Sequence, residues 1–276
     1  MKKYIIIIPV LIVTFILTKN CQKEITENLE TDNNIEIKTD KIVKVFYNNE
    51  NNEISINDYV LSVLSCEMPA LFEEEALKAG AVAIRTFYMF KENNESNYIA
   101  TNSDQCYRTI EDMKQNWQEN FDQYYNRLKR IVEETDGEFV TYDGEIIESF
   151  YFSMSNGYTE NSEEVFIKAY PYLVSVSSTW DKNVNNYEKT TIFSLNEFKS
   201  KLGIISDYID ININSYSEGK RIKEMTINNK IYKGTEIRKL LNIRSTDFDI
   251  KVEGGQVYIT TRGYGHGFGI SQYGAN

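Results

Sequence analysis

Glu67 has a carboxyl side chain that can donate or accept a proton, and its position in the sequence favours that chemistry. It ends an amphipathic segment, residues 58–67, just before Met68-Pro69. If this segment is helical, Val60, Val63 and Glu67 share one face, because residues three and four positions apart are neighbours on a helix. A carboxyl on an apolar face is costly as an anion, so its pKa should rise, as a general acid requires. The alternative is a frayed last turn in which Glu67 points into water.

A glycine-rich segment near the end of the sequence is the second candidate site. Five glycines lie between Gly263 and Gly274, with the only histidine of the chain, His266, among them. Glycine permits positive φ angles and lets a ligand approach main-chain N–H groups closely. The spacing is not a dinucleotide-binding motif, because neither a βαβ pattern nor a later acidic residue accompanies it. His266 is therefore a candidate site residue, and a hydrogen-bonded structural histidine is the alternative.

Residues 153–160, with the sequence Ser-Met-Ser-Asn-Gly-Tyr-Thr-Glu, form a third polar segment. Its density of hydroxyl and amide groups suits the recognition of a sugar or an oxyanion. An ordinary Asn-Gly turn is the alternative.

The three cysteines, Cys21, Cys66 and Cys106, are too few and too scattered for a disulfide scaffold. Cys66 precedes Glu67, but no histidine lies near it in the sequence to activate a nucleophile. We therefore predict that Cys66 is a small buried thiol. A bridge between Cys66 and Cys106 stays open from the sequence alone.

The charge and the N-terminal residues indicate where the protein acts. The formal net charge is −11, from 41 acidic and 30 basic side chains, so we predict no nucleic-acid partner. A Lys-Lys pair followed by an apolar stretch predicts a signal anchor over residues 1–20, with the remainder outside the cytoplasm. Lipid attachment at Cys21 is the weaker alternative, because the two residues before it are not small. Residues 21–40 are acidic and Asn-rich, which predicts a flexible linker.

The remaining residues predict a mixed α+β fold, with a helical core, β-hairpins and two lobes around a cleft. A strand at 41–47 precedes the helix of Glu67, which Asn57 or Asp58 would cap. A buried helix follows from about 73 to 90. Its Arg85 has apolar neighbours and needs an acidic or carbonyl partner, which makes it a candidate to brace the Glu67 region.

Later segments alternate between helix and hairpin patterns. A long amphipathic helix with apolar positions from 117 to 132 precedes a hairpin over 139–152 with an Asp-Gly turn. Ser194 would cap a helix that Gly203 ends, and a further hairpin surrounds Gly254-Gly255. The predicted domains are the anchor at 1–20, the linker at 21–40, a catalytic core at 41–193 and 249–276, and a small α+β lobe at 194–248.

Several of these segments together carry a family resemblance. The chain resembles the stage II sporulation protein D family over about residues 42–276. The matching blocks occur in the family order: Ser65-Cys66-Glu67-Met68-Pro69-Ala70, Glu75 to Thr86, Ser153 to Asn161, Pro171-Tyr172-Leu173, Gly263 to Gly267, and Gln272 to Ala275. The predicted N-terminal anchor is also similar.

The resemblance implies a lytic transglycosylase of bacterial peptidoglycan, which acts during forespore engulfment on glycan strands without stem peptides. The essential glutamate of the family lies in a Glu-Met-Pro motif and matches Glu67. One carboxyl suffices: Glu67 protonates the oxygen between N-acetylmuramic acid and N-acetylglucosamine, then accepts the C6 hydroxyl proton, which gives a 1,6-anhydro end. We expect the other motif residues to hold sugar hydroxyl and N-acetyl groups: Ser155, Asn156, Tyr158, His266, Gln272 and Tyr273.

The chain departs from its relatives at one metal site. Some family members bind zinc through a His and two Cys in the loop that corresponds to residues 97–107. Here only Cys106 remains, and the other ligand positions match Ala100 or Gln105. We therefore predict no metal and no cofactor. The family also continues beyond the position of Asn276, so we expect either an incomplete chain or a missing C-terminal cap.

The resemblance also implies a setting and partners. The expected partners are peptidoglycan glycan strands, a stem-peptide amidase and a membrane protein of the engulfment machinery. The expected location is the mother-cell membrane facing the forespore, with one N-terminal anchor and the catalytic domain outside the cytoplasm. Two alternatives remain: a non-catalytic glycan-binding activator similar to amidase enhancers, and an engulfment scaffold in which Glu67 is incidental.

Overall fold

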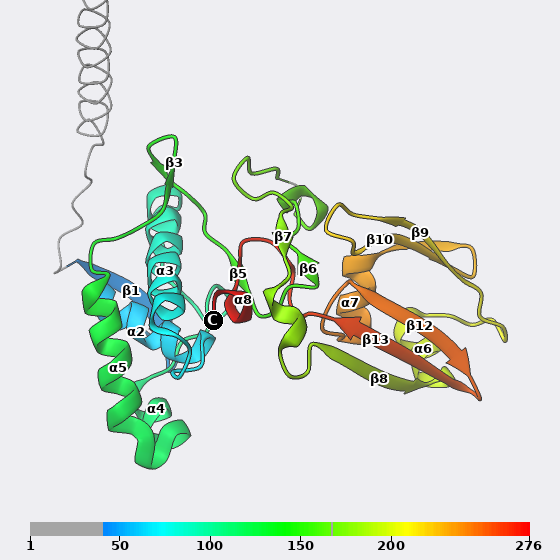
Figure 1. Ribbon diagram of the computed structural model, residues 1–276, viewed down its shortest axis with the longest axis horizontal. Helices are drawn as coiled ribbons and strands as arrows, with labels where there is room; N and C mark the ends of the chain where they lie inside the picture. The colour runs from blue at the N-terminus through cyan, green and yellow to red at the C-terminus, as the bar shows by residue number, and fades with distance from the viewer. Residues whose placement is uncertain (1–40, 167) are drawn as a thin grey trace, which may run out of the picture.

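The structure is a computed structural model that describes residues 41–166 and 168–276. Helices and strands are mixed as expected, with helices gathered at one end of the molecule and most strands at the other (Figure 1). We refer to the helical part (41–134), the sheet part (188–262) and the central part between them (135–187 and 263–276). The predicted anchor at 1–20 and linker at 21–40 lie outside the described residues. Among the helices that are described, none combines the length and apolar character needed to cross a bilayer.

The helical part begins with an antiparallel hairpin of β1 (Ile42–Tyr47) and β2 (Glu50–Ser55). Val43 and Val45 of β1 are buried in the main apolar core. The sequence predicts β1 but not β2, because Glu-Asn-Asn-Glu-Ile-Ser lacks the alternation of apolar residues that marks a half-buried strand.

α2 (Ile56–Glu67) follows directly and has Glu67 as its last residue. The side-chain oxygen of Ser55 accepts a hydrogen bond from the N–H of Asp58 at 3.0 Å, so Ser55 is the N-cap. The prediction that Asn57 or Asp58 caps this helix is wrong, because both residues already lie in its first turn.

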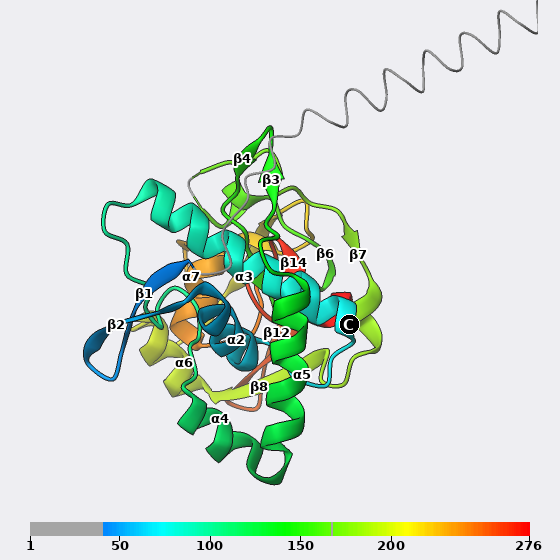
Figure 2. The ribbon, with the colours of Figure 1, turned by 90° about the vertical axis from the view of Figure 1, so that its left-hand side faces the viewer.

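α3 (Glu74–Asn94) packs closely on α2, and both helices contribute to the main core. At Gly80 of α3 a Cβ atom would lie 2.4 Å from Sδ of Met68. The missing side chain therefore lets the end of α2, which carries Glu67, lie tightly against α3. Figure 2 shows this helical end of the molecule facing the viewer.

Two helices replace the single long helix predicted from its apolar positions at 117–132. α4 (Ile110–Trp117) and α5 (Phe121–Glu134) are separated by a 3-10 turn, η1 (Gln118–Asn120). Gln118 has a φ of 47°, and an α-helix does not continue through a residue with positive φ. The apolar stripe still faces the core, because these residues of α5 are buried: Leu128, Ile131 and Val132.

Short elements of the central part join segments that are far apart in the sequence. β3 and β4 form the predicted hairpin, in which Asp143 and Gly144 both have positive φ. The hairpin is shorter than predicted, because β5 leaves it and pairs in parallel with β14, while β6 pairs with β7. The elements are β3 (Thr141–Tyr142), β4 (Glu145–Ile146), β5 (Tyr151–Phe152), β6 (Gly157–Tyr158), η2 (Ser162–Glu164), β7 (Ser177–Ser178), η3 (Trp180–Asn183), β14 (Ile270–Ser271) and α8 (Gln272–Ala275).

The sheet part contains two antiparallel sheets, with strand orders β12-β13-β8 and β11-β10-β9, and two helices. As predicted, Ser194 caps α6 and Gly203 ends it with a φ of 67°. The sequence does not predict the four-residue strand β11. The elements are β8 (Glu188–Ser194), α6 (Leu195–Leu202), β9 (Ile211–Tyr216), β10 (Ile222–Ile227), β11 (Lys230–Lys233), α7 (Gly234–Leu241), β12 (Phe248–Glu253) and β13 (Gln256–Arg262).

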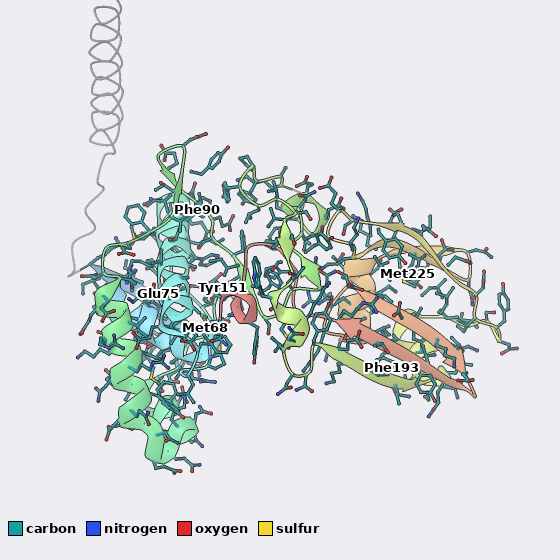
Figure 3. The ribbon with its side chains drawn as sticks, viewed as in Figure 1. Met68, Glu75, Phe90, Tyr151, Phe193 and Met225 are labelled. Atoms are coloured by element: carbon teal, nitrogen blue, oxygen red, sulfur yellow. A yellow bond between two sulfur atoms is a disulfide. The ribbon has the colours of Figure 1, made fainter. Side chains whose placement is uncertain are left out.

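A second apolar core holds the sheet part together. Phe193 and Met225, both labelled in Figure 3, belong to it, and so do Val257 and Ile259 of β13. The hairpin of β12 and β13, which we assigned to the catalytic core, therefore contributes its buried face to the core of the sheet part. The predicted domain boundaries stay predictions.

Candidate active site

Glu67 lies on the wall of a cavity of about 810 Å³. Its side chain is partly exposed there, whereas Val60 and Val63 on the same face of α2 are fully buried. The main-chain N–H of Cys106 donates a hydrogen bond to Oε1 of Glu67 at 2.8 Å. The helix thus remains ordered to its last residue and presents the Glu67 carboxyl to an open space.

Burial raises the pKa of Glu67 above its ordinary value. The Cys106 main-chain N–H, which donates to the carboxyl, and the neighbouring side chains of Gln272 and Tyr151 lower the pKa and act in the opposite direction. Within residues 41–166 and 168–276, no Lys or Arg forms an ion pair with Glu67. A partly desolvated carboxyl without a cation keeps access to its protonated form, which a general acid needs.

A chain of three hydrogen-bonded side chains lies behind Glu67, of which Tyr59 and Gln105 are buried and Tyr151 is partly buried. Oη of Tyr59 donates to Oε1 of Gln105 at 3.0 Å, and Nε2 of Gln105 donates to Oη of Tyr151 at 3.0 Å. The Tyr151 side chain lines the same cavity as Glu67, and each of the two groups affects the pKa of the other. Figure 3 shows Tyr151 at the centre of the molecule, beside the C-terminal segment. From the sequence, Gln105 is named only as a position that matches a zinc ligand, and neither Tyr59 nor Tyr151 is predicted as a site residue.

His266 lines the same cavity as Glu67. Its ring lies 3.8 Å from that of Phe268, centroid to centroid, and also contacts Phe150 and Phe152. Burial among these rings, with a smaller contribution from Arg238, lowers the pKa of His266 to about 3. The imidazole is therefore neutral at physiological pH, and can form hydrogen bonds with a ligand but cannot act as a cation.

Gln272 contacts Glu67, and neither Gln272 nor Tyr273 lines the large cavity. Nε2 of Gln272 donates to the main-chain oxygen of Glu67 at 3.1 Å. The ring of Tyr273 packs edge-on against Phe72 at 4.9 Å. These contacts hold α8 against the end of α2 and the loop that follows it, so the structure brings Gln272 to Glu67 and Tyr273 to Phe72 from a distant part of the sequence.

The structure places Ser155, Asn156 and Tyr158 apart from Glu67, at the junction with the sheet part. Nδ2 of Asn156, which is buried, donates to Oδ2 of Asp247 at 2.8 Å and to the main-chain oxygen of Gly219 at 2.9 Å. Oγ of Ser155 is buried and donates to the main-chain oxygen of Tyr158, whose ring is exposed. None of the three lines the large cavity, and their role in sugar binding stays a prediction.

Arg85 is fully buried and has carbonyl partners, as its surroundings require. Its guanidinium donates to the main-chain oxygens of Glu138 and Val132 and to Oδ1 of Asn57. These contacts tie α3 to the start of α2 and to the residues around the end of α5. Arg85 therefore supports the helical part at the end of α2 opposite to Glu67.

Cys66 and Cys106 form a disulfide bond. The prediction of a free buried thiol at Cys66 is wrong, and the bridge left open from the sequence is present. The sequence cannot decide this, because the two residues are 40 positions apart and only the fold brings them together. The bond joins the end of α2 to the loop whose Cys106 N–H contacts Glu67.

Many residues of the cavity wall are not predicted as site residues from the sequence. Oη of Tyr170 donates to the Glu148 carboxylate, and Nζ of Lys168 lies 4.5 Å from the centre of the Tyr170 ring. The exposed ring of Phe166 packs on Phe268. These residues lie in irregular segments without periodicity, where the density of aromatic residues is the one signal that could have found them. The wall includes Phe87, Lys91, Ser103, Asp104, Glu148, Phe150, Phe166, Lys168 and Tyr170.

The residues that match the zinc ligands implied by the family resemblance do not fit a metal here. The sulfur of Cys106 is bonded to Cys66, and the side chain of Ala100 has no atom that can bind a metal. The amide oxygen and nitrogen of Gln105 are both hydrogen-bonded to tyrosine hydroxyls. In the described part of the chain, no group of three or more His, Cys, Asp or Glu side chains could hold a metal ion.

Comparisons with known proteins identify the family. The Stage II sporulation protein family model matches residues 47–142, which include Glu67. The chain is 40% identical over 233 residues to Stage II sporulation protein D of Bacillus amyloliquefaciens, covering 81% of this chain and 68% of that protein. This chain belongs to the stage II sporulation protein D family. The family protein of Bacillus subtilis (strain 168) is 39% identical with the same coverage. An amidase enhancer of Bacillus subtilis is 26% identical over 269 residues, covering 77% of this chain and 36% of that protein.

Proposed function

We propose that this protein is a peptidoglycan lytic transglycosylase of sporulation, with Glu67 as its single general acid and base. The observation that carries the proposal is the Glu67 carboxyl, which lines a large cavity, has a pKa raised by burial and has no cation partner among the described residues. Membership of a sporulation family supports the biological setting.

The proposed reaction moves one proton out and one proton back. Protonated Glu67 donates to the glycosidic oxygen between N-acetylmuramic acid and N-acetylglucosamine while the bond from that oxygen to C1 breaks. The Glu67 anion then accepts the proton of the C6 hydroxyl of the same muramic acid, whose oxygen bonds to C1. The product ends in a 1,6-anhydro ring, and no water is consumed. A second carboxylate to activate water is therefore unnecessary.

The cavity suits a short stretch of glycan. Its volume of about 810 Å³ is within the range of ligand pockets, and its wall combines aromatic rings with hydroxyl, carboxylate and ammonium groups. The exposed ring of Phe166 offers an apolar face on which a sugar ring can stack. Neutral His266, with Ser103 and Asp104, offers hydrogen bonds to hydroxyl and N-acetyl groups. We propose these residues as the sugar contacts nearest to Glu67.

The cellular setting remains part of the proposal. A single N-terminal anchor would hold the catalytic part outside the cytoplasm, at the mother-cell membrane facing the forespore. A stem-peptide amidase would prepare peptide-free strands for cleavage, and a membrane protein of the engulfment machinery would localise both. No cofactor takes part in the proposed reaction.

Mass spectrometry of the products tests the proposal. Purified protein is incubated with peptide-free glycan strands, and we expect 1,6-anhydro ends to accumulate with the unmodified protein but not with Glu67→Gln. The amide keeps the size of the side chain and the acceptor for the Cys106 N–H, while it removes the titratable proton. Products with ordinary reducing ends, or unchanged release by Glu67→Gln, would contradict it.

The second candidate is a non-catalytic activator of an amidase, favoured by the similarity to an amidase enhancer. Under this reading the cavity binds glycan without cleaving it. The test compares how strongly Glu67→Gln and the unmodified protein stimulate a purified amidase. Equal stimulation, with no anhydro product from either protein, would support the activator function and contradict the enzymatic one.

A further inference from the structure

Tyr59, Gln105 and Tyr151 form a hydrogen-bond chain behind Glu67, and the inference drawn from it rests on the proposed function. We propose that Tyr151 is a positioning residue for Glu67: held in place by Gln105 and Tyr59, its hydroxyl donates to the Glu67 carboxylate and stabilises the anion that exists between the two proton transfers. Tyr151 lies on β5, Gln105 lies in the loop after α3 and Glu67 ends α2, and all three side chains line the same cavity.

The direction of the chain follows from what each group can donate. Tyr59, which is 1% exposed, gives its only proton to Oε1 of Gln105. The amide of Gln105, which is 5% exposed, therefore turns its NH₂ towards Tyr151 and donates to Oη. A hydroxyl that already accepts from an amide still has its own proton to give, and an ionised carboxylate can only accept. The Tyr151 proton is thus directed to Glu67.

Tyr151 keeps that proton throughout the reaction. Burial, with the facing Glu67 carboxyl as the next largest cause, raises the pKa of Tyr151 well above its ordinary value. The hydroxyl therefore donates a hydrogen bond without becoming a proton source, and the proton that moves is the one on Glu67. Because Gln105 donates to the same oxygen, it polarises the Tyr151 hydroxyl and strengthens its bond to Glu67.

Only neutral donors are placed to stabilise the Glu67 anion among the described residues. The ionisable groups that share the cavity wall with Glu67 are Asp104, Glu148, Lys91, Lys168, Tyr170 and His266. Lys91 is engaged by Glu95 at 2.7 Å and lies 3.9 Å from Glu148, and His266 is neutral. No cation among the described residues contacts Glu67. Tyr151 acts there together with the Cys106 N–H and Gln272.

Carbon-13 NMR of the glutamate side-chain carboxyls reads Glu67 directly and needs no substrate. Glu67→Gln identifies its signal, and the pH titration is repeated for Tyr151→Phe. Because a donor to the ionised form lowers a pKa, its removal should move the Glu67 midpoint to higher pH. Gln105→Met should give a smaller shift in the same direction and Tyr59→Phe the smallest. Tyr88→Phe is the matched control, since this buried tyrosine packs on Tyr59 but bonds to the main chain of Lys44, and it should leave the midpoint unchanged.

The pH profile of glycan cleavage is the second readout. Tyr151→Phe should lower the plateau rate about ten- to a hundredfold, the value of a hydrogen bond to a charged group, and move the alkaline limb to higher pH. A structural role alone would lower the rate without moving the limb. An unchanged Glu67 midpoint in Tyr151→Phe overturns the inference, whatever happens to the rate. Should that variant not fold, the midpoint in Gln105→Met decides in the same way.

The two proposals fail separately. The unmodified protein could release no anhydro product while the Glu67 titration midpoint still moves in Tyr151→Phe. That result would support the contact between Tyr151 and Glu67 and contradict the proposed reaction. If the product forms and depends on Glu67 while the midpoint stays fixed, the reaction stands and the role of Tyr151 falls.

Discussion

Two glutamates, Glu67 in the helical part and Glu160 at the junction with the sheet part, have opposite environments. Burial raises the pKa of both. Glu160 is 2% exposed, and its carboxylate accepts hydrogen bonds from Oγ of Ser217 at 2.6 Å and from the N–H of Gly219 at 3.2 Å. It also forms an ion pair with the guanidinium of Arg221 at 3.9 Å. Glu67 is partly exposed, contacts neutral donors and faces a cavity.

The difference separates a carboxylate that is held in a buried ion pair from the one to which we assign the proposed reaction. Glu160 is held by a buried cation, so protonating it would leave Arg221 without its partner in the interior. Glu67 has no such partner among the described residues, so its protonation leaves no buried cation unpaired. A raised pKa alone does not distinguish the two residues; the cavity and the neutral donors do.

The largest expected effect follows from exchanging each carboxyl for an amide. Glu67→Gln should lower the rate of glycan cleavage by about 10²- to 10⁴-fold, the usual contribution of general acid–base catalysis. Glu160→Gln should leave the rate per folded molecule nearly unchanged. Equal losses in both variants, measured by product release at matched folded concentration, would erase the contrast.

Stability should respond in the reverse order. Glu160→Gln leaves the buried Arg221 charge without its partner and should lower the free energy of unfolding by about 3–5 kcal/mol. Glu67→Gln has no ion pair to lose and should unfold near the midpoint of the unmodified protein. Urea unfolding followed by circular dichroism gives both values, and a stable Glu160→Gln protein would show that Arg221 is solvated.

The disulfide beside Glu67 should matter next. Replacing both Cys66 and Cys106 by Ser removes a cross-link that spans 40 positions and should cost about 2–4 kcal/mol in unfolding free energy. Because the N–H of Cys106 contacts Glu67, the rate of cleavage should fall as well. A double variant with unchanged stability would mean that the thiols are free, which a thiol count on the unfolded, unreduced protein checks independently.

The glycine-rich segment should show a smaller effect. Gly267 has a φ of 96°, and a Cβ atom there would lie 2.5 Å from Cζ of Arg221. Gly267→Ala should therefore cost about 2 kcal/mol or more, from backbone strain and overpacking. Gly254→Ala, also at positive φ but with open space around it, is the control and should cost about 1 kcal/mol. Equal costs at both positions would show that Arg221 moves freely.

The smallest effect concerns the single histidine. Burial lowers the pKa of His266 to about 3, so the folded protein binds fewer protons than the unfolded chain between that value and the ordinary value of 6.5. Its contribution to stability is therefore complete above pH 6.5 and is lost as the pH falls towards 3. The proton NMR signal of the ring should not titrate between pH 5 and 8. A midpoint near 6.5 would show that the ring is solvated.

Features that depend on neighbouring residues are predictable from this sequence. The helix that ends at Glu67, the Ser194 cap, the Gly203 stop and the Asp143-Gly144 turn all follow from local periodicity and turn chemistry. The break at Gln118 is a local exception, because nothing in its sequence announces the positive φ.

Features created by long-range pairing are not predictable in the same way. Tyr151 reaches Glu67 because β5 leaves its hairpin to pair with β14, and Gln105 reaches Tyr151 through a loop that the disulfide holds. No spacing in the sequence encodes these contacts. The motif residues around Ser155 and Asn156 illustrate the converse, because their side chains are engaged in the junction with the sheet part.

Cleavage of peptide-free glycan strands in water enriched in oxygen-18 tests most directly whether one carboxyl returns the proton it gives. We expect new muramic acid ends of anhydro mass without the heavy isotope, since the C6 oxygen of the sugar closes the ring. New ends that carry oxygen-18 at C1 would mean that water attacks, and the single-carboxyl mechanism at Glu67 would be contradicted.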